Sequence, residues 1–207
     1  MKQETKVTCL FLDIGGVMLS NGWEYEFRKI AADHFQLDFK EMEDRHELNM
    51  VTLEEGKLTL SEYLNRVVFY ETRPFTPDQF RDFMFSLTTS YEDMIAYFRA
   101  LKEKYKLKIA VVSNEGRELN EYRIQKFQLT QFVDFFISSC YVHFRKPDAD
   151  IFRLAIDIAQ VPLENVVLID NTKMFVDIAK QMGIRSIHHK NYLATSEELA
   201  SMGLSIG

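Results

Sequence analysis

The chain has 207 residues, of which 46% are hydrophobic and 27% are charged, and its formal net charge is −6. A chain of this length can bury a core without disulfides or a structural metal. Basic residues form no run of the kind that binds nucleic acid. The apolar stretches are far shorter than the roughly 20 residues that cross a bilayer. We therefore expect a globular protein with no nucleic-acid partner and no membrane partner.

The two cysteines, Cys9 and Cys140, lie in apolar runs and are not spaced like a zinc site. Free cysteines in a core are typical of a reducing compartment. The amino-terminal segment has a basic residue but lacks the apolar region and small-residue cleavage site of a secretory signal. The sequence thus predicts a cytoplasmic protein, and it leaves the oligomeric state open.

Short apolar runs without polar alternation predict five buried parallel strands. They lie at residues 7–12, 107–112, 135–139, 166–169 and 185–188. Helical patterns fill the later intervals, for example at 148–159 and 173–182. This alternation predicts an α/β fold with a doubly wound parallel sheet.

Residues 13–106 separate the first two predicted strands, far more than one crossover helix needs. Amphipathic patterns and capping residues predict helices within this segment. Those helices are expected at 23–35, 40–50, 59–68, 76–87 and 92–105. The last one leads back into the sheet. We therefore expect a helical insert at residues 20–88, called the insert below, within a core made of residues 1–19 and 89–207.

Polar residues follow three of the predicted strands. Asp13 comes after the first strand, Ser113 and Asn114 after the second, and Asp170 and Asn171 after the fourth. In open α/β sheets, ligands bind beyond the carboxyl ends of the strands, where the strand order reverses. These residues are therefore the first candidates for a functional site.

Lys146 adds a cation to this set, on a loop that precedes a predicted helix. Together the candidates offer a carboxylate for nucleophilic attack or metal binding, and a hydroxyl and an amide for an oxyanion. The lysine can balance the charge of a phosphate. Such a set suits phosphoryl transfer assisted by a hard divalent cation.

Four segments in chain order resemble the motifs of the haloacid dehalogenase-like phosphohydrolases. They are Leu-Phe-Leu-Asp13-Ile-Gly-Gly-Val, Val-Val-Ser113-Asn114, Arg-Lys146-Pro-Asp and Val-Leu-Ile-Asp170-Asn. The resemblance spans the whole chain, because the insert lies where that superfamily has its cap domain. A helical cap after a first motif of this form resembles the branch of sugar-phosphate phosphatases and epoxide hydrolase phosphatase domains. The resemblance implies a Mg²⁺-dependent enzyme that hydrolyses small phosphorylated substrates.

The resemblance also implies a role for each motif residue. Asp13 would attack phosphorus, form an aspartyl-phosphate and bind Mg²⁺, as would the backbone carbonyl of Gly15. Ser113 and the amide of Asn114 would hold phosphate oxygens. Lys146 would stabilise the nucleophile and the phosphate.

Two positions depart from the family's pattern. Gly15 stands where most of these phosphatases carry the aspartate that protonates the leaving oxygen. Asn171 stands beside Asp170 where the fourth motif usually presents two acids. The implied metal site therefore consists of Asp13, Gly15, Asp170 and Asn171 and carries one negative charge less than usual. We expect slow turnover, and faster hydrolysis of aryl and acyl phosphates than of alkyl phosphates, unless another acid replaces Gly15.

Two other functions remain open. A binding or regulatory protein could keep the phosphate pocket without turnover, as Gly15 and Asn171 would favour. A haloacid dehalogenase of the same fold would need no metal, but dehalogenases usually carry a bulky residue near the nucleophile. Trp23 and Tyr25 are further candidates for the substrate cleft, and His143 for a supporting position near the site.

Overall fold

One parallel sheet forms the centre of the computed structural model, which describes residues 6–206. Its strands are β1 (Cys9–Leu12), β2 (Lys108–Ser113), β3 (Phe135–Ser138), β4 (Val166–Asp170) and β5 (Arg185–His188). Each strand lies on a predicted apolar run, with ends that differ by at most two residues. The predicted α/β fold with a doubly wound parallel sheet is therefore confirmed. Residues 1–5 and 207 of the expected core lie outside the described residues.

The strand order is β3-β2-β1-β4-β5, so the direction of winding changes at β1. Leu12, at the end of β1, pairs with Val111 of β2 on one side and Ile169 of β4 on the other. The crevice for ligands in such sheets opens at this change of direction. The residue after Leu12 is Asp13.

Helices cover both faces of the sheet, because successive side chains of a strand point to opposite faces. Leu10 and Leu12 pack on one face in a cluster that includes α5 (Glu92–Tyr105) and α10 (Tyr192–Ser201). The neighbouring Phe11 packs on the other face with α8 (Ala149–Ala159) and α9 (Lys173–Gln181). Because both faces of the sheet are buried, each strand is a continuous apolar run in the sequence.

Between the core strands the chain also forms α6 (Arg117–Lys126) and α7 (Ser139–Val142). Two short 3-10 helices lie at Leu129–Gln131 and Leu163–Asn165. The predicted helices at 148–159 and 173–182 correspond to α8 and α9, whereas α7 and α10 were not predicted.

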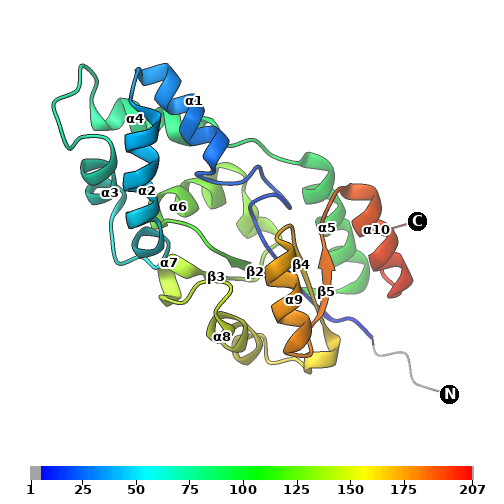
Figure 1. Ribbon diagram of the computed structural model, residues 1–207. Helices are drawn as coiled ribbons and strands as arrows, with labels where there is room; N and C mark the ends of the chain where they lie inside the picture. Colours follow the sequence, from blue (N-terminus) through cyan, green and yellow to red (C-terminus); the bar gives the residue numbers. More distant parts are fainter. Residues whose placement is uncertain (1–5, 207) are drawn as a thin grey trace.

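The helices α1 (Tyr25–Phe35), α2 (Phe39–Glu54), α3 (Leu60–Val67) and α4 (Pro77–Ser86) gather at one side of the molecule (Figure 1). Their buried residues form a third apolar cluster, which Leu119 of α6 joins from the core. The side chains of Thr59 and Thr76 cap α3 and α4, and Pro77 is the first helical residue of α4.

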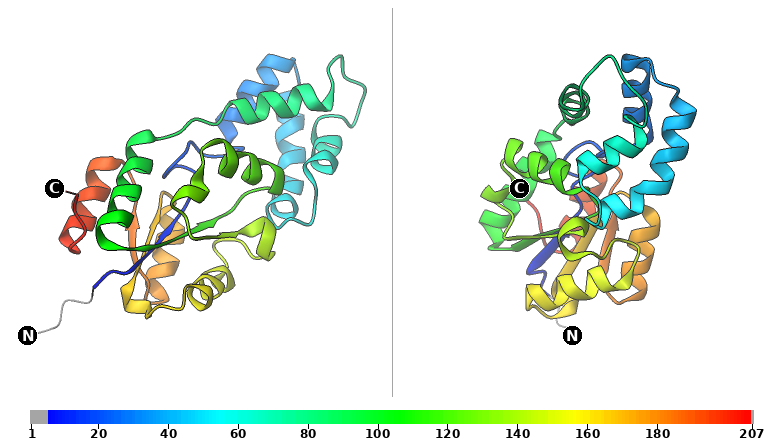
Figure 2. Two further views of the ribbon diagram at one scale, coloured as in Figure 1. Left: turned by 180° about the vertical axis from the view of Figure 1, so that it is seen from behind. Right: turned by 90° about the vertical axis from the view of Figure 1, so that its left-hand side faces the viewer.

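The chain enters and leaves this helical group through adjacent segments. The Ser20 N–H donates to the Thr89 carbonyl at 2.9 Å, and the Tyr91 N–H donates to the Met18 carbonyl at 2.9 Å. Figure 2 shows the group joined to the rest of the molecule from two further directions. The division into a core and an insert at 20–88 stays a prediction, and these paired segments support it.

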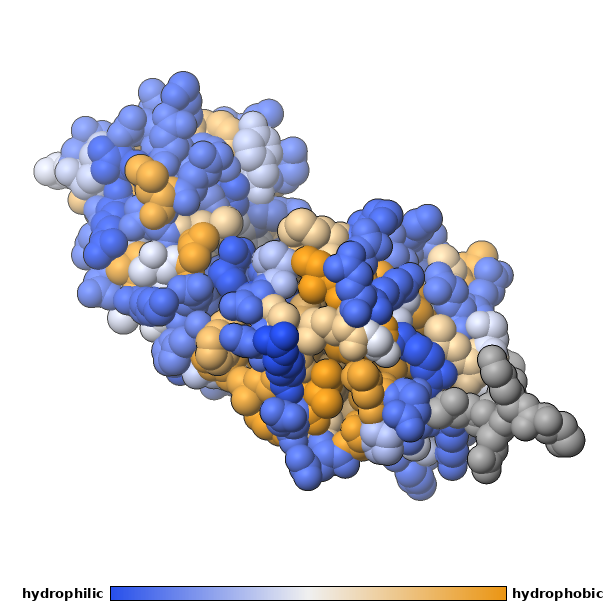
Figure 3. Space-filling view, turned by 60° about the horizontal axis from the view of Figure 1, so that its bottom comes forward, coloured by the Kyte–Doolittle hydropathy of each residue, from blue (hydrophilic) through white to orange (hydrophobic). Residues whose placement is uncertain are grey.

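No helix within residues 6–206 has the length and apolar character that a bilayer crossing requires. Seen from below, the molecule exposes more apolar surface over the core than over the helical group (Figure 3). The exposed apolar side chains of the core helices include Ile158 of α8 and Met174 of α9.

Candidate active site

The ends of β1, β2 and β4 bring the predicted residues together at one edge of the sheet. Asp13 follows β1, while Ser113 and Asp170 are the last residues of β2 and β4. All three side chains are buried. Because β1 lies between β2 and β4, Asp13 is central in the group.

Lys146 contacts the carboxylates of both Asp13 and Asp170. Its Nζ lies 3.2 Å from Asp13 Oδ2 and 2.5 Å from Asp170 Oδ2. The lysine side chain is completely buried, so the carboxylates replace the water that its charge has lost. The sequence placed Lys146 on a loop, and the structure brings that loop onto the strand ends.

Asn114 holds the Lys146 loop in place. Its Nδ2 donates to the Lys146 carbonyl at 2.8 Å, and its Oδ1 accepts from the Lys146 N–H at 2.7 Å. The side-chain amide of Asn114 therefore makes its hydrogen bonds with the Lys146 backbone. Its backbone N–H is the group that remains for a phosphate.

Burial and charge act against each other at Asp13 and Lys146. Burial raises the pKa of Asp13, whereas Lys146 acts to lower it and Asp170 adds to the increase. Burial acts to lower the pKa of Lys146, but Asp13 and Asp170 outweigh it and hold that pKa above its ordinary value. Lys146 is therefore an ammonium ion at neutral pH.

Asp170 lies beneath the site. Its Oδ1 accepts from the Thr172 N–H at 2.7 Å, while its Oδ2 accepts from Lys146. Asn171 lines a cavity over these residues, described below, and its Nδ2 donates to Asn21 Oδ1 at 3.2 Å. The two neighbouring residues thus play different parts, one holding the lysine and one facing the ligand space.

The glycines after Asp13 are required by close packing. A Cβ on Gly15 would lie 3.3 Å from Asn21 Oδ1 and 3.4 Å from Asn21 Cα. Gly16 has a φ of +68°, and a Cβ there would lie 2.0 Å from Asn171 Nδ2. In this arrangement the segment that begins the insert covers the place above Gly15. A side chain at position 15 would thus require Asn21 to shift by a few tenths of an ångström.

A polar cavity of about 170 Å³ opens over these residues. Its lining includes every predicted residue of the four motifs except Asp170. Unpredicted residues complete the lining, namely Asn21, Gly22, Glu54, Glu115, Arg123, Arg145, Thr172 and Phe175. The volume and polar lining suit a phosphate-sized anion, and we call this space the polar cavity.

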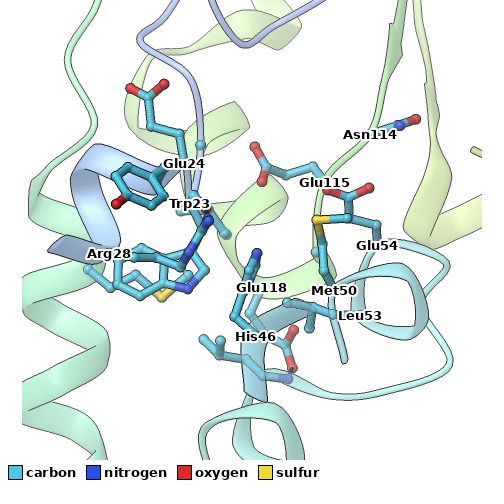
Figure 4. Close-up of a pocket in the computed structure, with 16 residues that line it drawn as sticks. Trp23, Glu24, Arg28, His46, Met50, Leu53, Glu54, Asn114, Glu115 and Glu118 are labelled. Atoms are coloured by element: carbon cyan, nitrogen blue, oxygen red, sulfur yellow. Dashed lines mark hydrogen bonds between the residues drawn. The ribbon is translucent and has the colours of Figure 1, made fainter. Parts of the chain in front are cut away.

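A second cavity, of about 340 Å³, lies between the helical group and the core. It is lined by Trp23 and Tyr25, the candidates for a substrate cleft, together with apolar residues such as Leu53 and Met84. Figure 4 shows side chains from α2 and from the segment after β2 converging on this space. We call it the apolar cavity. By contrast, His143 lines neither cavity, and its ring contacts the Glu55 carbonyl.

Two ion pairs that the sequence did not reveal flank the cavities. Arg145 Nε and Nη2 contact Glu54 Oε2 at 2.9 and 2.7 Å, joining the core loop to α2. The completely buried Arg123 pairs with Glu115 and also donates to the Ser20 carbonyl at 2.5 Å. Arg145 is next to Lys146 in the sequence and Glu115 is next to Asn114, and this proximity was the only sign that they lie near the site. Nothing in the sequence indicated their partners.

Burial raises the pKa of both acids. For Glu54 the opposing influence is Arg145, and for Glu115 it is Arg123. Both acids therefore hold a proton more readily than a glutamate in water does. Raised pKa values of this kind occur in catalytic acids and also in structural ion pairs.

A family model described as a haloacid dehalogenase-like hydrolase matches residues 7–183. No curated protein matches the chain. Solved structures do match it across most of its length, at identities that show the fold alone.

A HAD family enzyme of Bacteroides thetaiotaomicron is 18% identical, with a TM-score of 0.76 over 89% of this chain and 94% of that one. A predicted HAD-like family hydrolase of Porphyromonas gingivalis is 21% identical, with a TM-score of 0.73 over 94% and 98%. The L-2-haloacid dehalogenase of Xanthobacter autotrophicus is 18% identical, with a TM-score of 0.60 over 94% and 83%.

Proposed function

This chain belongs to the haloacid dehalogenase-like hydrolases, and we propose that it is a Mg²⁺-dependent phosphatase that hydrolyses small phosphate esters through an aspartyl-phosphate on Asp13. The observation that carries the proposal is the buried contact of Lys146 with both Asp13 and Asp170 at the floor of the polar cavity. A lysine in this place can balance the nucleophile and the phosphate together.

The residues around the polar cavity would divide the work of phosphoryl transfer. An oxygen of Asp13 attacks phosphorus, and the electron pair of the breaking P–O bond goes to the ester oxygen. The Ser113 hydroxyl and the Asn114 N–H donate to phosphate oxygens. The Lys146 ammonium stays beside both charges, so that little rearrangement is needed in the transition state.

The donor set at this edge fits a hard cation, since it consists of oxygens from carboxylate, amide and backbone groups. Asp13, the Gly15 carbonyl and Asn171 line the polar cavity and would hold Mg²⁺, which would neutralise charge on the phosphate oxygens. Asp170, whose two oxygens accept from Thr172 and Lys146, would contribute to the metal site through its negative charge. Two carboxylates and one ammonium leave one net negative charge in the metal-free site. One Bacteroides thetaiotaomicron structure is a complex with magnesium and inorganic phosphate, which supports the choice of metal.

The polar lining favours a phosphatase over a dehalogenase. The ionic floor and the Asn21, Asn171 and Arg145 side chains would have to lose water to receive a carbon–halogen bond. A phosphate gives these donors an acceptor for each lost hydrogen bond. Retention of Asp13, Ser113 and Lys146 together also favours turnover over binding alone.

A panel of phosphate esters tests the proposal, with phosphate release measured in Mg²⁺ and in EDTA. We expect metal-dependent release that Asp13→Asn lowers by roughly 10⁴-fold or more, as loss of a nucleophile does elsewhere. Thermal unfolding of Asp13→Asn checks that the variant is folded. Undiminished release by this variant would contradict the mechanism, and halide release from 2-haloacids would favour the dehalogenase.

A further inference from the structure

The junction between the two cavities locates the bond that would break, and this step rests on the proposed function. Four residues line both cavities, namely Gly22, Glu54, Asn114 and Glu115. A substrate with its phosphate in the polar cavity and its remaining part in the apolar cavity has its ester oxygen at this junction. Any group that protonates this oxygen must reach the same place.

Glu54 and Glu115 carry the two carboxyl groups at the junction, and Figure 4 shows them from α2 and from the segment after β2. The Glu115 carboxylate is enclosed. One oxygen pairs with the completely buried Arg123, and a Cβ on Gly22 would lie 2.6 Å from the other. A neutral Glu115 would leave a buried guanidinium without its counter-ion, which is costly. Glu115 is therefore better suited to hold Arg123 than to donate a proton.

Glu54 is held more openly. Nε and Nη2 of Arg145 both contact Oε2 of Glu54, which leaves Oε1 of Glu54 available to carry a proton. The side chains of Glu54 and Arg145 are 21% and 22% exposed, so that water can solvate Arg145 when Glu54 is neutral. Lys146 acts to lower the pKa of Glu54 and Asp13 acts to raise it, and the Glu54 charge also raises the pKa of Glu115. Burial raises the pKa of Glu54, which favours the protonated form.

We propose that Glu54, the last residue of α2, is the general acid that replaces the aspartate missing at Gly15. Asp13 forms the bond to phosphorus while the P–O bond to the leaving group breaks. The proton of Glu54 passes to the ester oxygen, so that the leaving group departs as an alcohol. The Glu54 carboxylate then takes a proton from the water that hydrolyses the aspartyl-phosphate, which restores the starting state.

The placement of Glu54 on the helical group makes the acid part of the substrate enclosure. Arg145, one residue before Lys146, ties Glu54 to the loop that contacts the nucleophile. Arg145 is a positioning residue in this account, because it fixes the distance between the acid and the phosphate. For in-line displacement, the acid must lie on the side of phosphorus opposite the nucleophile.

The dependence of the rate on the leaving group distinguishes a general acid from a residue with only a structural role. An alkyl phosphate needs a proton on its leaving oxygen, whereas 4-nitrophenyl phosphate needs little help. We compare kcat/KM on both substrates for the wild-type protein, Glu54→Gln and Glu115→Gln. Glu47→Gln, an exposed change on the same helix, is the matched control. Glutamine keeps an oxygen for Arg145 but has no transferable proton.

We expect Glu54→Gln to lower kcat/KM on the alkyl phosphate by roughly 10²–10⁴-fold, the usual contribution of a general acid. On 4-nitrophenyl phosphate the decrease should be less than about tenfold, and Glu47→Gln should leave both values unchanged. An equal decrease on both substrates would overturn the proposal and assign Glu54 a structural role. A selective loss in Glu115→Gln, with Glu54→Gln active, would also overturn it.

Failure of the proposed function has a different signature. A wild-type protein that releases phosphate from neither substrate would overturn the phosphatase and the acid together. Asp13-dependent release with equal losses in Glu54→Gln would overturn the acid alone. Thermal unfolding of each variant shows whether a loss comes from misfolding, and Glu54→Asp, with a shorter acid, should recover part of the alkyl activity.

Discussion

Lys146 shows how one buried residue sets the charge of the candidate site. Its ammonium lies against two carboxylates, and the lysine and Asp170 are completely buried. The attraction between these groups offsets the free-energy cost of removing each charge from water, which would be large for any one of them without a partner. The same contact that would balance a phosphate thus also stabilises the fold.

Replacement of Lys146 by methionine should lower the free energy of unfolding by about 3–5 kcal/mol at neutral pH, because two buried carboxylates lose their counter-ion. The loss should shrink in acid. Burial already raises the pKa of Asp13, and removal of Lys146 raises it further, so the folded protein binds protons more tightly than the unfolded chain. Stability gained by proton binding is present at low pH and is lost as pH rises through the folded-state pKa.

Denaturant unfolding between pH 4 and pH 7.5 measures this difference. Lys173→Met is the control, because Lys173 forms an exposed pair with Asp177 and should contribute less than about 1 kcal/mol. A variant without Lys146 that is as stable as the wild type at neutral pH would mean that the buried pair does not form.

Asn171 is the second residue whose chemistry can be tested by one substitution. It lines the polar cavity, and its amide nitrogen contacts Asn21. Asn171→Asp adds a negative charge beside the proposed metal ligands and should tighten Mg²⁺ binding by roughly tenfold, the lower end of effects at supporting positions. Calorimetry with Mg²⁺ alone measures the affinity, and Asn165→Asp before β4 is the control. Unchanged affinity would place residue 171 outside the metal's reach.

Among the elements, the turn after β1 is tightly packed against the residues of the candidate site. Gly16 has a positive φ, and its hydrogen atom occupies the space beside Asn171. The turn places Asp13 beneath the segment that enters the helical group, so that a change in its path would move both the nucleophile and the metal-binding residues.

Gly16→Ala should therefore be more costly than the same change at another left-handed glycine. Gly203 has a φ of +88° and no neighbouring atom within 4 Å of a Cβ, so Gly203→Ala should cost about 1–3 kcal/mol from backbone strain alone. Gly16→Ala adds a Cβ at 2.0 Å from Asn171 Nδ2 and should be destabilised further. Denaturant unfolding of both variants gives the comparison. Equal losses would show that the turn adjusts without strain.

At the scale of the whole molecule, the sequence predicted the sheet better than the contacts around it. Continuous apolar runs identified β1 and β4, because strands buried on both faces show no polar alternation. The short helix α7 and the last helix, α10, lack such a signal. The polar residues at the strand ends were also predictable, since parallel strands end at a common edge.

The pairs between the helical group and the core were beyond prediction. Glu54 and Arg145 are 91 positions apart, and each alone is an ordinary charged residue in its own segment. Their meeting depends on how α2 packs over the loop that carries Lys146. One sequence contains no local pattern for such packing, which is why the candidate acid emerged only from the structure.

The phosphorylated form of Asp13 gives the most direct test of the account. The protein is mixed with radiolabelled 4-nitrophenyl phosphate and Mg²⁺, quenched in acid and digested, and the labelled peptide is identified. We expect label on the peptide that contains Asp13, and hydroxylamine should release it as it does from an acyl phosphate. The label should be absent from Asp13→Asn and from samples in EDTA. Turnover without label on this peptide, or equal labelling of Asp13→Asn, would contradict the account.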